Sequence, residues 1–484
     1  MSELSICNVR IKSSPTHGWR RAGHELWWAG VAAASAAMFV LPDPRTVLTL
    51  IMFAAAIALS IWKPEIGLAI LVVSVPLQDK WPASLGSVSL TWNRLLLLCI
   101  LVAWTARVLC RHERLRMSLL GCTAVAYVTA LVASVANARD IGAWAGESYR
   151  WGVAAVVLVV ATSIAQERRD RRWLLAALGL GILGSFAVAV HQIWTDSGPE
   201  TFNQRGLLRV YGFFGEPNPF AVYLEFAVLP FAALVATAWW YKRGVVSRPL
   251  VVISVAMGAI GTATLLLTQS RGGLLGFLTG IAIIVWYAAE RTGRFLVIGG
   301  CVLTLLVLAT PVARDVRAAL GFDALFGDQA QVTSNNFAVH ERMAHWEAAF
   351  RMWKEQPLLG IGAGNVPVRF RELTPQWRFR IPRGHAHNNY LQAAAQAGSI
   401  GLICYLALLV AALRQCHRNL LRTASAEQRA ICTGAPAVTA ALAVHGMFEY
   451  THVLSLGIAL SIIWAAASSM ELDQTRETAL HGHN

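Results

Sequence analysis

Charged side chains are scarce in this chain. Only 14% of its 484 residues are Asp, Glu, Lys or Arg, whereas 56% are hydrophobic. That balance excludes a soluble globular protein, in which about a quarter of the residues carry charge. The alternation of polar and apolar residues that is typical of a membrane β-barrel is also missing. Apolar runs recur instead, and a run of roughly 20 residues can cross a membrane as a helix. The sequence therefore predicts an all-α, polytopic transmembrane helical bundle of 12–14 spans.

Cysteine patterns that would form disulfides or bind zinc are lacking as well. None of the eight cysteines lies in the polar segment 312–397, and no CxxC or mixed His/Cys spacing occurs. Acidic residues are outnumbered, with 27 against 41 basic ones and a net charge of +14. The basic residues gather in short segments between the apolar runs. This pattern is the positive-inside bias of membrane proteins, so nucleic acid is not expected as a partner.

The apolar runs divide the chain into three regions. We predict N-terminal transmembrane helices at 1–311, a large periplasmic loop at 312–397, and C-terminal transmembrane helices with a cytoplasmic tail at 398–484. If each candidate span crosses once, the basic short loops all fall on one side, which is then the cytoplasm. The large loop would face the periplasm from a bacterial inner membrane. The candidate spans are 27–41, 46–62, 65–77, 92–109, 118–135, 148–165, 173–194, 218–240, 249–268, 272–289, 295–311, 398–413, 430–447 and 453–469.

The large loop is predicted to be partly helical. Residues 335–356 have an amphipathic pattern, with Trp346, Ala349, Phe350 and Trp353 on one face. Arg342 lies one turn before Trp346 on that apolar face, where a solvated helix would not place an arginine. Two interpretations remain open: a functional cation, or an arginine that stacks on Trp346 or pairs with a neighbouring carboxylate.

Two histidines and two asparagines stand where the large loop meets the next apolar run. They are His385, His387, Asn388 and Asn389, within HAHNNYLQAAAQAGSIGL. A neutral imidazole suits a general base near neutral pH, so one histidine is a candidate for that role. No metal site is predicted, because no third ligand stands at a recognised spacing.

A second candidate is Arg271 in TQSRGGLLGF, which interrupts a long apolar stretch. An arginine near the membrane interior usually has a partner or lines a pathway. The alternatives are a polar turn between two spans, or a side chain that reaches back to the interface.

The segment YGFFGEPNPFAVY at 211–223 is the remaining polar cluster. Two prolines make a rigid turn at the start of a span, which would place Glu216 and Asn218 at its mouth with Arg205 and Arg209 just upstream. A plain helix-entry turn capped by Asn218 is the alternative. Arginine binds phosphate well through its planar, permanently charged guanidinium group. A pyrophosphate-linked lipid would therefore suit the predicted periplasmic face.

These segments, taken in order, resemble the O-antigen ligase and polymerase superfamily. The similar pieces are YGFFGEPNPFAVYLE, SRGGLLGF, the helix from Arg342 through Trp346 to PLLGIGAGN, and HAHNNYLQAAAQAGSIGL. The resemblance implies a metal-independent, cofactor-free glycosyltransferase with a GT-C-like fold. Such enzymes take a glycan from undecaprenyl pyrophosphate and attach it to an acceptor sugar.

The resemblance also assigns residues. It implies that His387, Arg271 and Arg342 are catalytic, since His387 directly precedes the asparagine pair in the family pattern. We expect further substrate contacts near them, from Arg205, Arg209, Glu216, Asn218, His385, Asn388 and Asn389.

Three functions stay open from the sequence. The first is an O-antigen ligase with lipid A–core as acceptor, and the second is an O-antigen or exopolysaccharide polymerase with a lipid-linked repeat as acceptor. A transporter or flippase is the third, but its spans should carry charges at the membrane midplane. Here the ionisable residues of the spans, such as Glu225 and Glu449, mostly lie towards the predicted periplasmic ends.

Overall fold

The computed structural model confirms a helical membrane bundle. It describes residues 54–77, 83–85, 88–90, 92–111, 117–165, 168–204, 206–241, 246–310, 337–373, 384–423, 425–453 and 455–481. Within these ranges, eight helices are long and apolar enough to cross a membrane, and three shorter apolar helices accompany them. The predicted span 27–41 and the start of 46–62 lie outside the described residues.

The helices follow the predicted spans closely. They are α3 (Pro64–Ser74), α4 (Trp92–Arg111), α5 (Leu119–Ala133), α6 (Ile141–Ile164), α7 (Arg168–Trp194), α8 (Pro217–Trp240), α9 (Arg248–Leu267), α10 (Arg271–Ala288), α11 (Glu290–Ala309), α14 (Phe337–Glu355), α15 (Val366–Leu373), α16 (Asn389–Arg422), α17 (Ala426–His445) and α18 (Leu456–His481). Short antiparallel hairpins join β1 (Ala83–Leu85) to β2 (Val88–Leu90) and β3 (Asn203–Gln204) to β4 (Leu207–Leu208).

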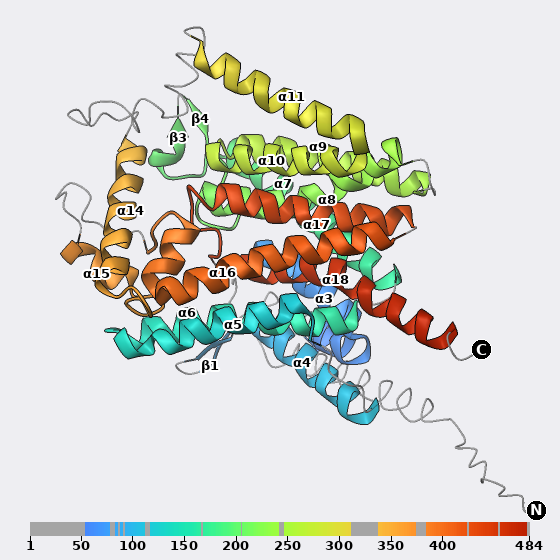
Figure 1. The fold of residues 1–484 in the computed structure, drawn as a ribbon, viewed down its shortest axis with the longest axis horizontal. Helices are drawn as coiled ribbons and strands as arrows, with labels where there is room; N and C mark the ends of the chain where they lie inside the picture. The colour runs from blue at the N-terminus through green and yellow to red at the C-terminus, as the bar shows by residue number, and fades with distance from the viewer. Residues whose placement is uncertain are drawn as a thin grey trace, which may run out of the picture.

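Most long helices run side by side, and α14 and α15 lie across one end of the bundle (Figure 1). In this view α8 and α10 lie on one side of α16 and α17, and α5 and α6 lie on the other. Helix α8 is at the centre, since nearly all of its residues are buried, whereas α11 at the edge is almost fully exposed. An edge helix that is this apolar suits a lipid environment.

A glycine face allows α10 to pack unusually close to its neighbours. A Cβ atom at Gly276 would lie 2.7 Å from the carboxylate of Glu225 on α8 and 3.0 Å from the carbonyl oxygen of Ala441 on α17. Gly280 faces the same two helices, and Gly273 faces α8. Small residues at such positions let membrane helices approach each other closely. The glycines of the SRGGLLGF segment therefore fix the place of Arg271, the first residue of α10.

The helices α14 and α15 form a cap at this end of the bundle, which we call the site end (Figure 1). A small apolar core holds the cap together, made by Ala348, Ala349, Met352, Ile361, Val366, Phe370, Ala386 and Ala395. The predicted helix at 335–356 is confirmed within a few residues. The helix buries Ala348, Ala349 and Met352 within the molecule, whereas Phe350 is 41% exposed.

The cap is tied to α16 where that helix breaks. Ala397 and Gly398 leave helical geometry, and Gly398 has a φ of +66°. Its Cα faces the main chain of Leu358, so no side chain would fit there. The Ser399 amide donates to the carbonyl of Pro357 at 2.7 Å, and the Ile361 amide donates to Ala395 at 2.9 Å. These main-chain bonds join the loop after α14 directly to the broken helix.

Asn365 ties the cap to the turn between α5 and α6. Its side-chain oxygen accepts the amides of Arg139 at 3.1 Å and Asp140 at 2.7 Å, and its side-chain nitrogen donates to the carbonyl of Asp140 at 3.0 Å. The side chain is fully buried. The LLGIGAGN segment is therefore a connector that holds the cap on the bundle by two separate attachments.

Candidate functional site

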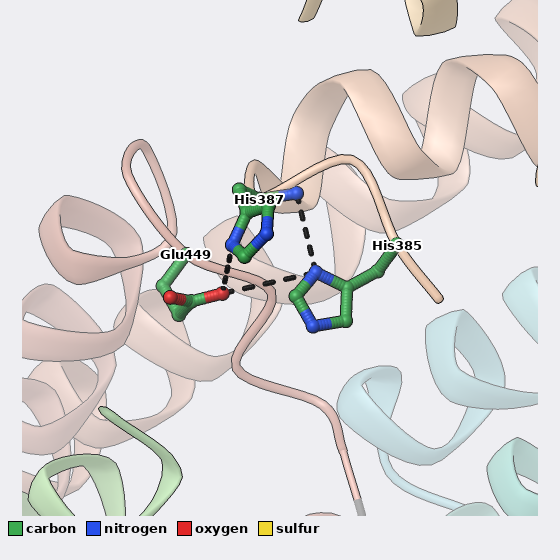
Figure 2. A group of neighbouring side chains, drawn as sticks. All are labelled: His385, His387 and Glu449. Atoms are coloured by element: carbon green, nitrogen blue, oxygen red, sulfur yellow. Dashed lines mark hydrogen bonds and ion pairs between the residues drawn. The ribbon is translucent and has the colours of Figure 1, made fainter. Parts of the chain in front are cut away.

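The candidate site lies at the end of the bundle that α14 and α15 cover, where loops from distant parts of the chain meet. The loop before α16 carries His385 and His387, and the loop after α17 carries Glu449 (Figure 2). Both imidazole rings point towards the carboxylate, although 62 residues separate His387 from Glu449. The amide of Asn389 donates to the carbonyl of Gly446 at 2.7 Å, which joins the two loops through their main chains.

Glu449 is the centre of the cluster. One oxygen, Oε1, is 2.7 Å from Nδ1 of His387 and accepts the amide of Tyr450 at 3.1 Å. The other oxygen, Oε2, accepts the side-chain amide of Asn218 at 2.7 Å and lies 3.7 Å from Arg342. Burial would raise the pKa of Glu449, but the hydrogen bond from His387 and the positive charge of Arg342 hold it well below the usual range. Glu449 is therefore an ionised carboxylate at neutral pH.

His387 is held in an unusual backbone conformation with φ of +49°. Its carbonyl accepts the indole N–H of Trp346 from α14 at 3.2 Å, and the following residue, Asn388, caps α16. Since Nδ1 donates to the carboxylate of Glu449, the lone pair of the neutral ring lies on Nε2. That atom is buried and makes no hydrogen bond to any described residue. A largely buried imidazole with one nitrogen bound to a carboxylate and the other unused has the geometry of a general base.

His385 is arranged differently. Its Nδ1 accepts the amide of His387 at 3.3 Å, so the proton of the neutral ring lies on Nε2. Burial, and then the charge of His387, lower the pKa of His385 to about 3. The ring stays neutral at ordinary pH and packs edge-on against His387, with ring centroids 4.4 Å apart.

Three arginines lie on one side of the cluster. Arg209 donates to the carbonyl of Thr268 at 3.0 Å and to Asn218 at 3.3 Å. Burial lowers the pKa of Arg209, and the charges of Arg342 and Arg271 lower it further, which shows that the three guanidinium groups are near one another. The structure therefore brings together Arg271, Arg342 and His387 from three separate segments.

Asn218 connects the starts of two helices to this cluster. It stands in the first turn of α8, and its oxygen accepts the hydroxyl of Ser270 at 3.0 Å. Ser270 is also the cap of α10 and accepts the amide of Gly273 at 3.2 Å. The alternative of Asn218 as the helix cap is wrong, because Glu216 is the N-cap residue of α8 and the Asn218 side chain binds Ser270 and Glu449 instead.

The other predicted substrate residues have varied positions. Asn388 and Asn389 use their amides within the protein: Asn388 binds the amides of Tyr390 and Leu391, and Asn389 binds Tyr405 and Thr451. Glu216 is exposed at the start of α8. Arg205 lies outside the described residues.

His385, His387 and Glu449 are close enough to be considered as metal ligands, since their ligand atoms lie within 4.8 Å of one another. The 2.7 Å between Nδ1 of His387 and Oε1 of Glu449 fits a hydrogen bond. Two ligands of a tetrahedral ion at about 2.1 Å would be about 3.4 Å apart. The lone pair of His385 is also already used by the amide of His387. The three residues fit a hydrogen-bonded cluster better than a metal site.

A comparison with known families accounts for much of this region. Residues 256–406 match the family described as O-antigen ligase. This part of the chain is therefore an O-antigen ligase segment. No curated protein matches the chain significantly. The O-antigen ligase segment contains Arg271, Arg342, His385 and His387, together with the cap and the first part of α16.

The O-antigen ligase segment does not include every part of the cluster. Asn218, Arg209 and Glu449 come from residues outside the match, before and after it. Glu449 is the residue that sequence reasoning missed, because it was seen only as an ionisable residue near a span end. A carboxylate left in an otherwise apolar stretch was the available signal, but only the fold shows that His387 is its partner.

Proposed function

We propose that this chain is an inner-membrane glycosyltransferase of the O-antigen ligase type, with its site on the periplasmic face. It would move a glycan from undecaprenyl pyrophosphate to a hydroxyl of lipid A–core. The observation that carries the proposal is the unused Nε2 of His387, opposite an ionised carboxylate and beside three arginines.

His387 acts as the general base. Its Nε2 takes the proton of the acceptor hydroxyl while that oxygen forms a bond to the anomeric carbon, with inversion. Glu449 orients the ring through Nδ1 and stabilises the imidazolium that forms. The bond from the anomeric carbon to the pyrophosphate oxygen breaks, and its electron pair leaves with the pyrophosphate.

The arginines stabilise the leaving group. Negative charge grows on the pyrophosphate as its bond breaks, and fixed guanidinium groups of Arg209, Arg271 and Arg342 can bind it without reorganisation. This arrangement needs no metal ion, so a chelator should leave transfer unchanged. Loss of one such contact is expected to cost on the order of 2–4 kcal/mol of transition-state stabilisation.

The direct test supplies purified protein with lipid-linked O-antigen and lipid A–core, and follows capped product on a gel. His387→Ala should abolish transfer, whereas His191→Ala should not, since His191 is an exposed histidine on α7 that contacts Thr195. Unimpaired transfer by His387→Ala would contradict the mechanism. If only a lipid-linked repeat serves as acceptor, the protein is a polymerase, and movement of lipid without bond formation would make it a transporter.

A further inference from the structure

Two consecutive residues of the loop after α17 reach to opposite sides of the site. Glu449 directs Oε2 towards Asn218 and Arg342, on the side of α8 and α10. Tyr450 directs its hydroxyl to the other side, where it donates to Oε1 of Glu147 on α6 at 2.5 Å. In Figure 1, α10 and α6 lie on opposite sides of α16 and α17. The site therefore has an arginine side and an α6 side.

The α6 side is a buried polar cluster. The carboxylate of Glu147 has a side-chain exposure of only 6%, and it accepts from Tyr450 at one oxygen and from Arg150 at the other, at 2.6 Å. Trp151 donates to the Tyr450 hydroxyl at 3.4 Å. Burial and the charge of Glu147 raise the pKa of Tyr450, so its hydroxyl keeps its proton and the hydrogen bond persists.

Arg150 is the exposed member of this cluster. Its side chain is 43% exposed, and Nη1 binds Glu147. No other hydrogen bond of this guanidinium joins it to a described residue, and a guanidinium has five N–H donors. Glu147 and Tyr450 thus fix the orientation of Arg150 while most of its donors stay available to a ligand.

The chemistry of the transfer says which ligand this side would take. An attacking hydroxyl approaches the anomeric carbon from the face opposite the leaving group. If the pyrophosphate binds the three arginines, the acceptor must come from the α6 side. His385 lies along this side, with its ring centroid 5.6 Å from that of Tyr450. A neutral imidazole, a tyrosine and an oriented arginine are suitable contacts for a sugar that carries an anionic group.

We propose that Arg150, positioned by Glu147 and Tyr450, binds an anionic group of the acceptor glycan and brings its hydroxyl to His387. This inference rests on the proposed glycosyl transfer. The group is a phosphate or a carboxylate on the acceptor sugars, since either can accept two N–H donors of one guanidinium.

The test measures transfer while donor and acceptor are varied separately. Arg150→Gln should raise the acceptor KM roughly 10- to 100-fold, as expected for the loss of charged hydrogen bonds, and should leave the donor KM unchanged. Arg150→Lys should restore part of the loss. Tyr450→Phe should also raise the acceptor KM, but by less, because it loosens the position of Arg150 without removing its charge. Arg351→Gln is the matched control, since Arg351 forms a similar exposed pair with Glu347 on α14.

Different results separate the two proposals. If the wild-type protein transfers no glycan, the proposed function fails. If transfer is normal but Arg150→Gln keeps the acceptor KM of the wild type, or raises only the donor KM, the acceptor site is wrong. Acceptor treated with phosphatase should bind the wild type as weakly as untreated acceptor binds Arg150→Gln. If that treatment has no effect, acceptor with reduced carboxyl groups should show the weakening instead, and no effect of either treatment would refute an anionic contact.

Discussion

Replacement of Glu449 by glutamine tests the proposed base most sharply. The amide keeps the size of the carboxylate but has only one acceptor atom. If its oxygen faces His387, its NH₂ group faces the donating amide of Asn218, which lies 2.7 Å from Oε2 in the native protein. If its NH₂ group faces His387, the ring must take the other tautomer, and Nε2 then carries a proton and cannot act as a base.

The size of the effect follows from both outcomes. General-base catalysis is worth roughly 10²- to 10⁴-fold in rate, and a histidine held in the wrong tautomer loses about 10⁴-fold in serine proteases. We therefore expect kcat of Glu449→Gln to fall by roughly 10²- to 10⁴-fold, or about 2.7–5.4 kcal/mol of transition-state stabilisation. The donor KM should change little, because the three arginines stay in place.

The assay is transfer of O-antigen to lipid A–core in detergent, with melting temperatures measured in parallel. Glu427→Gln is the matched control. Its carboxylate is equally buried and binds Arg168 at 2.5 Å and Arg172 at 2.6 Å, at the starts of α7 and α17 away from the site end. This control should keep its kcat. If Glu449→Gln keeps kcat within about threefold while His387→Ala is inactive, the carboxylate does not support the base.

Three further predictions concern stability. Gly276→Ala should lower the melting temperature by the equivalent of about 1–3 kcal/mol, because its Cβ would meet a carbonyl oxygen that cannot move aside. Gly258→Ala is the control, since its Cβ would stand in open space and should leave the melting temperature unchanged. Equal melting temperatures of the two variants would contradict the close packing of α10. The pKa of His385 falls from about 6.5 in the unfolded chain to about 3 in the fold, so the unfolded state binds more protons between these values and stability should fall as pH drops below about 6.5, by up to about 1.4 kcal/mol per pH unit. His385→Gln should flatten that slope in melts from pH 7 to 4, and an unchanged slope would exclude His385 as its source. Asn365→Ala removes the buried hydrogen bonds to the α5–α6 turn and leaves the amides of that turn unpaired. The loss should lower the stability of the fold by about 1–3 kcal/mol and speed proteolysis of the cap. An unchanged rate of cleavage would show that other contacts hold the cap in place.

Hydropathy predicted the spans well but missed where several helices begin. Helix α6 starts at Ile141, before the predicted 148. Helix α16 starts at Asn389, and the predicted start at 398 coincides with the break at Ala397 and Gly398. In both helices the first turns are too polar to be recognised as part of a membrane span from hydropathy. They are nevertheless helical, because the side chains of Asp140 and Asn388 accept their first amides, and because α14 and α15 pack beside them.

The candidate site was partly predictable for a similar reason. The motifs pointed to Arg271, Arg342 and His387, since charged or titratable residues at span ends are rare and costly. Their meeting point was not predictable, because Glu449 stands alone in the sequence and gains its meaning only from the packing of α17 beside α16. The connector role of LLGIGAGN was also hidden, since its glycines are required by main-chain contacts across the molecule.

The three arginines of the site have a consequence for the whole catalytic cycle. Without an anion between them, Arg209, Arg271 and Arg342 repel one another, and Glu449 and Glu216 offset that repulsion only in part. A pyrophosphate relieves that repulsion whether or not it still carries a glycan. The spent carrier lipid should thus stay bound nearly as well as the loaded one. Release of the carrier lipid, and not formation of the glycosidic bond, would then be the rate-limiting step of successive turnovers.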